Sequence, residues 1–157
     1  MINVDLQCEY EADNLPNFEH FNLWATTALK CLRDTADLSI VIVGSEQSQS
    51  LNLEFRGKDK PTNVLSFPFE APLELAHIQN EMGNLIGDIV ICAPVVEQQA
   101  REQNKPLLHH WAHMVTHGCL HLLGYDHIKD EEADVMENLE RQILVKLDIN
   151  DPYLITE

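Results

Sequence analysis

The segment from His117 to His127 constrains the fold of this chain most, because it holds three histidines at offsets of four and six residues. Residues four apart lie on one face of a helix, with Cβ atoms about 5–6 Å apart. The imidazoles of His117 and His121 can therefore reach one metal ion through bonds of about 2.0–2.1 Å. Gly124 can take the left-handed conformation that ends a helix, and the turned chain can bring His127 back. The segment predicts a three-histidine metal site on a helix and the turn after it.

Two neighbouring side chains fit this site less well. His113 shares the face of His117, but it is eight residues from His121, about 12 Å along a straight helix. One small ion cannot bridge that separation, so we expect His113 to support a ligand or to pack beside it. Cys119 lies about 200° around the helix from His117, so its thiol should point away from the metal.

The histidine spacing is that of the metzincin peptidases, H-E-x-x-H-x-x-G-x-x-H, with one change. Gly118 stands where those enzymes have a glutamate. That glutamate is their general base, which takes a proton from the attacking water. The sequence therefore predicts a peptidase-like metal cage with a different chemistry.

A second segment, Arg56 to Phe67, combines cations with glycine and proline. A planar guanidinium beside Gly57 suits bidentate phosphate binding. The alternative is a solvated loop that carries charges of both signs. Asp88, next to Gly87 in a predicted strand, is either a partner for a histidine or a bulge residue.

The periodicity of the chain predicts a single α+β domain over residues 1–157, with a small mixed sheet covered by helices. The expected strands are residues 2–8, 38–43, 63–67 and 85–92, and the expected helices are residues 18–33, 45–55, 94–103, 106–123 and 130–147. Residues 70–83 are expected to form a long loop. The acidic residues of the last helix, from Glu131 to Glu140, are interpreted as a solvated face near the positive end of its dipole.

Charge bears on which partners this chain can bind. The net charge of −16 argues against a polyanionic partner in general. However, three of the ten lysines and arginines fall between Arg56 and Lys60, which allows one cationic site on an acidic body. We expect no secretion signal and no membrane span. The four scattered cysteines indicate reduced thiols in a cytosolic protein.

Taken together, the two segments resemble the YbeY family of metal-dependent endoribonucleases, the rRNA maturation factors. The resemblance rests on Arg56 to Phe67, on Gly87-Asp88-Ile89 and on His117 to His127, and Asn63 departs from the aspartate that the family often has. It implies an α+β fold, one zinc ion on His117, His121 and His127, and an essential Arg56. It also implies cleavage of single-stranded RNA in rRNA processing and ribosome quality control.

The candidate catalytic residues are Arg56 and His117, and the candidate RNA-binding residues are Arg56, Lys58 and Lys60. A three-ligand zinc site keeps a position open for water or a phosphate oxygen, and Arg56 would stabilise the charge of the transition state. The general base stays open among Asp126, Asp88 and the RNA 2′-hydroxyl. Two alternatives remain: a metallopeptidase or amidase with the same cage, and a ribosome-associated binding factor with a structural metal.

Overall fold

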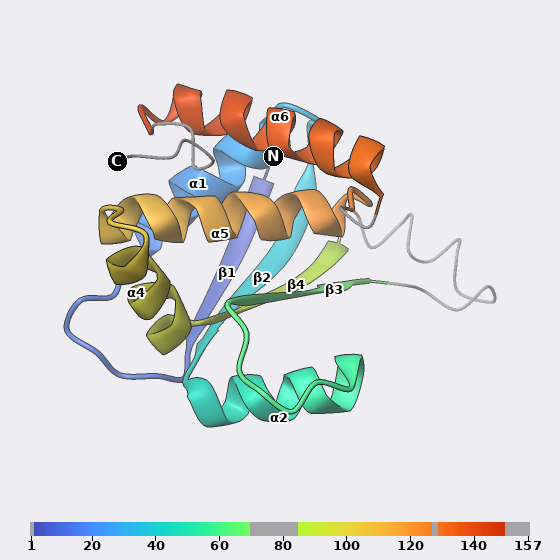
Figure 1. Ribbon diagram of the computed structural model, residues 1–157. Coiled ribbons are helices and arrows are strands. Elements are labelled where there is room, and N and C mark those ends of the chain that lie inside the picture. Colours follow the sequence, from blue (N-terminus) through green and yellow to red (C-terminus); the bar gives the residue numbers. More distant parts are fainter. Residues whose placement is uncertain (1, 70–84, 127–128, 150–157) are drawn as a thin grey trace.

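The computed structural model describes residues 2–69, 85–126 and 129–149. Its centre is a four-stranded sheet with the order β1-β2-β4-β3, where β1 is Ile2–Cys8, β2 is Ala36–Val43, β3 is Val64–Pro68 and β4 is Leu85–Cys92. The first three strands of this order run parallel, and β3 pairs with β4 in the antiparallel direction. The sheet is therefore mixed, with β3 at one edge (Figure 1).

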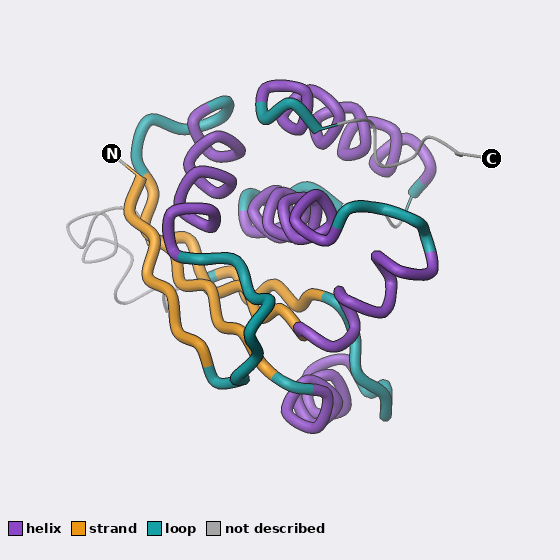
Figure 2. The backbone as a smooth tube through the Cα atoms, turned by 90° about the vertical axis from the view of Figure 1, so that its left-hand side faces the viewer, coloured by secondary structure: helices purple, strands orange, loops and turns teal. Residues whose placement is uncertain are grey.

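Five helices are described: α1 (Phe18–Lys30), α2 (Ser45–Arg56), α4 (Ala93–Glu102), α5 (Leu107–Leu122) and α6 (Asp130–Lys146). Helices α1 and α5 cover one face of the sheet, and α6 lies over them as an outer layer, while α2 lies on the opposite face (Figures 1 and 2). Helix α5 contacts β3, β4, α1, α4 and α6. It is therefore the element around which the helical side of the domain packs.

The alternation of side chains along the strands explains this layering. Ile40 on β2 and Ile89 and Ile91 on β4 are fully buried in the main core, beneath α1 and α5. Val43 on β2 and Val90 on β4 belong to a smaller cluster on the other face, which α2 covers in part. One face of the sheet thus supplies most of the apolar burial that stabilises the domain.

Most predicted elements are confirmed, with shifts at their ends. Strands β1 and β4 have the predicted bounds, whereas α1 ends at Lys30 instead of Arg33 and β2 begins at Ala36 instead of Leu38. Helix α2 extends one residue further than expected, to Arg56, because Gly57 takes the left-handed conformation (φ 71°) that caps it. The expected loop over residues 70–83 lies outside the described residues.

Candidate metal centre and cleft

Helix α5 carries a row of histidines along the face that it turns toward α6 and β3. His113 is buried, and His117 and His121 are half-buried. The helix ends as predicted, because Gly124 has φ 99° and its N–H donates to the carbonyl oxygen of His121. The turn that follows it leads toward His127, which lies outside the described residues.

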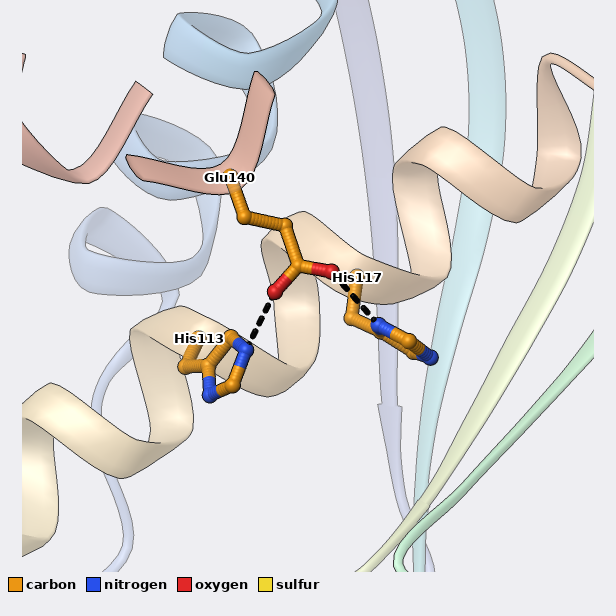
Figure 3. A group of neighbouring side chains, drawn as sticks. All are labelled: His113, His117 and Glu140. Carbon is orange, nitrogen blue, oxygen red and sulfur yellow. Dashed lines mark hydrogen bonds and ion pairs between the residues drawn. The ribbon is translucent and has the colours of Figure 1, made fainter. Parts of the chain in front are cut away.

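Glu140 of α6 lies between two of these histidines (Figure 3). Its Oε1 accepts a hydrogen bond from His117 Nδ1 at 2.9 Å, and its Oε2 accepts one from His113 Nε2. The carboxylate is fully buried. The interpretation of Glu140 as part of a solvated acidic face is therefore wrong. Glu140 lies four residues after Met136 and three before Ile143, which are both buried, so it belongs to the apolar stripe of α6.

The two histidines keep this buried carboxyl ionised. Burial by itself raises the pKa of Glu140, but the hydrogen bonds and charges of His113 and His117 outweigh it, and the pKa falls to about 2. An ionised carboxylate only accepts hydrogen bonds. The N–H at Nδ1 of His117 therefore points at Glu140, and Nε2 lies on the other side of the ring.

The Nε2 atom of His117 faces a second imidazole. The Nε2 atoms of His117 and His121 are 3.0 Å apart. Two nitrogens bound to one tetrahedral zinc ion at about 2.0–2.1 Å would be roughly 3.3 Å apart. The pair is thus close to the geometry of two metal ligands, and the contact between His117 and Glu140 is the carboxylate–histidine support that metal-binding histidines usually have.

A different grouping of the same side chains could also hold a metal ion. Suitable ligand atoms of His113, His117 and Glu140 all lie within 4.8 Å of one another. The chemistry of the donor set, two imidazoles and a carboxylate, fits a transition metal such as zinc. The described residues therefore support a metal centre on α5 and α6, with His117 common to both arrangements.

The close approach of α5 to the sheet explains why Gly118 follows His117. A Cβ atom at this position would lie 2.8 Å from Cγ2 of Ile89 on β4, closer than such atoms normally come. Position 118 faces the sheet, so a glutamate there would clash with Ile89. Cys119 also points away from the histidines as expected: it is fully buried in the main core, where burial raises the pKa of its thiol to about 12.

A cleft of about 760 Å³ opens beside His117 and His121. Arg56 and Lys58, at the end of α2 and just after it, line this cleft together with the two histidines. Residues separated by about 60 positions in sequence are thus brought to one site. Lys60 is not among the described lining residues, and its carbonyl oxygen instead accepts a hydrogen bond from Asn52 Nδ2 at 2.8 Å.

The two candidate base residues lie in different places. Asp126 lines the cleft. Asp88 is paired in register with Ser39 and is exposed in a shallow hollow with Val41 and Val90, on the α2 side of the sheet. Its neighbour Ile89 points the other way, toward Gly118 of α5. Asp88 is therefore not a partner of the described histidines.

A second polar network extends from β3 to the first half of α5. The Oε1 atom of Gln99 accepts hydrogen bonds from Asn63 Nδ2 at 3.2 Å and from His110 Nε2 at 2.9 Å. Burial, followed by the nearby His113 and Lys105, lowers the pKa of His110 to about 4, so this imidazole is neutral. The network holds the start of β3 against α4 and α5, and thereby fixes one wall of the cleft.

Comparisons with known proteins identify the family of this chain. The family model described as "Endoribonuclease YbeY" matches residues 6–148. The solution structure of TM1509 from Thermotoga maritima is similar over 98% of this chain and 99% of that one, with 26% identity and a TM-score of 0.58. The matched residues include those that line the cleft and the helices α5 and α6. The chain therefore belongs to the YbeY family of endoribonucleases, the nucleases of rRNA maturation.

Proposed function

We propose that this protein is a zinc-dependent endoribonuclease that cleaves single-stranded RNA during rRNA maturation and ribosome quality control. The observation that carries the proposal is that one cleft combines a pair of convergent imidazoles, His117 and His121, with the cations Arg56 and Lys58. Metal ligands and phosphate-binding groups in one place suit phosphodiester hydrolysis.

The proposed ligands of a single zinc ion are His117, His121 and His127. The first two are supported by the 3.0 Å separation of their Nε2 atoms, and Glu140 would hold the ring of His117 in place. A zinc ion there would polarise a phosphoryl oxygen and make a water molecule more acidic. Three protein ligands would leave a coordination position open for substrate.

The cleft residues would supply the remaining functions. The guanidinium of Arg56 would bind the non-bridging oxygens, where negative charge grows in the transition state. Lys58 would bind a neighbouring phosphate as a point charge. Of the carboxylates considered from the sequence, Asp126 is the one that lines the cleft, and we propose it as the general base. Attack by the RNA 2′-hydroxyl without a protein base is the alternative.

A metallopeptidase with the same cage is the second candidate function. Its catalytic glutamate would occupy position 118, where the chain has Gly118 packed against Ile89. The position that bears the peptidase base therefore faces the sheet. Metal-dependent cleavage of a peptide library by the pure protein would nevertheless make a metallopeptidase the favoured function.

The proposed partners are a single-stranded rRNA precursor and the ribosome, and the proposed location is the cytoplasm, where rRNA is processed. None of the helices in the described part of the chain is long and apolar enough to cross a membrane. Ribosome binding by a pure protein that cleaves no RNA would favour the alternative of a binding factor with a structural metal.

The test of the proposed function is the substitution Arg56→Ala. Cleavage of single-stranded RNA should fall by roughly a hundredfold or more, the usual effect of losing one transition-state stabiliser. Arg56→Lys should rescue only part of the rate, because an ammonium cannot make a bidentate contact. Metal content and thermal midpoint should stay unchanged, because Arg56 is exposed.

Lys60→Ala is the matched control, since it removes a cation from the same segment at a position that does not line the described cleft. Cleavage by this variant should stay near the wild-type rate, with at most weaker binding. Wild-type cleavage by Arg56→Ala at saturating RNA would remove Arg56 from the mechanism. A wild-type protein freed of contaminating nucleases that cleaves no RNA would overturn the proposal.

A further inference from the structure

Phe55 is a large aromatic side chain that the fold leaves in solvent at the rim of the cleft. Its side chain is 59% exposed, and it precedes Arg56 at the end of α2. An exposed phenylalanine costs hydrophobic stabilisation, because its apolar surface stays in water. Phe55 and its neighbour Phe67 both line the cleft that holds the histidines and Arg56.

The Phe55 ring is held in place although it is exposed. It makes an edge contact with the ring of Phe67 on β3, with centroids 5.1 Å apart and planes inclined at 68°. Such pairs are favourable beyond their area of contact. An aromatic ring that is fixed from one side and open to solvent on the other loses little conformational entropy when a flat ligand covers it.

The segment around Phe55 is anchored by polar contacts. Ser48 Oγ and the backbone of Thr62 exchange two hydrogen bonds of 3.0 Å, and Asn52 Nδ2 donates to the carbonyl oxygen of Lys60 at 2.8 Å. Both Ser48 and Asn52 are buried although they are polar. These contacts tie the loop after α2 to the helix, so the backbone that carries Arg56 and Lys58 is anchored beside Phe55.

We propose that Phe55 is a stacking site for an unpaired nucleobase, and that it contributes the preference for single-stranded RNA. This rests on the proposed function. The cations Arg56 and Lys58 beside the ring would bind the phosphates of the same strand, and an extended strand would place one base over Phe55. A base within a duplex already has both faces covered by its neighbours, so only an unpaired base can offer a face to the ring.

The test measures binding separately from cleavage. The probe is a fluorescein-labelled oligoadenylate with phosphorothioate linkages, which resist hydrolysis, titrated with the metal-loaded protein and followed by anisotropy. Phe55→Ala should weaken binding by between about fivefold and about a hundredfold, the range observed when a stacking aromatic is removed. Binding of a blunt-ended duplex probe should change little, so the ratio of single-strand to duplex affinity should fall.

Two further variants distinguish base stacking on a flat ring from a contact that any apolar side chain could make. Phe55→Tyr keeps a flat ring and should bind like wild type, whereas Phe55→Leu should bind like Phe55→Ala. Leu53→Ala is the matched control, because Leu53 is 49% exposed on the same helix and is absent from the described lining of the cleft. All variants should keep the wild-type thermal midpoint, because Phe55 and Leu53 are both exposed.

Wild-type affinity of Phe55→Ala for the single strand would overturn the proposal, and so would full binding by Phe55→Leu, which would indicate an apolar contact of another kind. The nuclease assay on the same proteins keeps the two proposals apart. A wild type that binds the strand through Phe55 but does not cleave it would refute the proposed function alone. Cleavage with no effect of Phe55→Ala on binding or on KM would refute the stacking site alone.

Discussion

Glu140 shows how one buried side chain can hold two histidines of another helix in place. It accepts one hydrogen bond from each of two histidines. It is fully buried, whereas the other acidic residues of the same helix are exposed or half-buried. Losing such a carboxylate leaves the ring of His117 without its support. Partners of this kind typically change metal affinity by about 10–100-fold when they are removed.

Metal content should therefore distinguish the two possible arrangements of ligands. His121→Ala should lose most of the bound zinc, because its Nε2 converges with that of His117. Glu140→Gln should keep the site but weaken zinc binding by about 10–100-fold, and His113→Ala should keep most of the metal. Chelator competition and elemental analysis measure these effects.

The control for this series is His109→Ala, a histidine of the same helix that lies outside both groupings. It should bind zinc as wild type does. Equal loss of zinc in His113→Ala and His121→Ala would contradict the assignment. Loss of zinc in His113→Ala with zinc retained in His121→Ala would place the ion between His113, His117 and Glu140 instead.

At the scale of elements, the packing of α5 on β4 depends on a residue with no side chain. Gly118 allows the helix to approach Ile89. The carbonyl oxygen of Gly118 also accepts a hydrogen bond from Ser66 Oγ on β3 at 3.3 Å. The distance between this helix and the edge strand β3 sets the width of the cleft. A larger residue at position 118 would push α5 and its histidines away from the sheet.

Gly118→Ala should therefore lower the free energy of unfolding by about 1–3 kcal/mol, the usual cost of overpacking a core. Gly118→Glu should destabilise more and should create no peptidase activity. Because Ile89 is the neighbour that clashes, the double variant Gly118→Ala, Ile89→Ala should lose less stability than the sum of the single variants. Urea denaturation measures this cycle. Additive losses would show that the contact with Ile89 is not the reason for the glycine.

At the scale of the whole molecule, the charge distribution limits how RNA can bind. The net charge is −16, and the described cleft has two cations, Arg56 and Lys58, in its lining. Affinity for RNA then depends on a few local contacts within a repulsive field. Most basic RNA-binding surfaces work in the opposite way, with many phosphate contacts and a steep dependence on salt.

The salt dependence of RNA binding should accordingly be shallow. Two phosphate contacts with a single strand predict a slope of log K against log salt of about −1.4, and Lys58→Ala should reduce its magnitude to about 0.7. Anisotropy titrations with the uncleavable probe at several salt concentrations measure this slope. A wild-type slope several times steeper would show that cations outside the described cleft take part in binding.

The sequence alone was enough to predict the fold class. The three-histidine spacing predicted a metal-binding helix that ends at Gly124, and the described part of that prediction, the helix with its left-handed glycine, is present. Alternation of apolar residues predicted the first strand, and a β-branched run predicted the second. Two of the four predicted strands, β1 and β4, have both of their bounds correct. These features depend on near neighbours in the chain, because periodicity and helix ends are local properties.

Only the tertiary structure decided which distant residues meet. Glu140 and Asp88 are both acidic residues among apolar neighbours, yet one is buried against His117 and the other is exposed on the far side of the sheet. Packing decides which face of a helix or strand is covered by other elements. The local sequence does not specify which residues of those elements an acidic side chain will contact. The same holds for Arg56 and Phe55, because the fold of α2 against the edge of the sheet brings them to the histidines. Side chains far apart in sequence become one site only when the layers of the domain assemble.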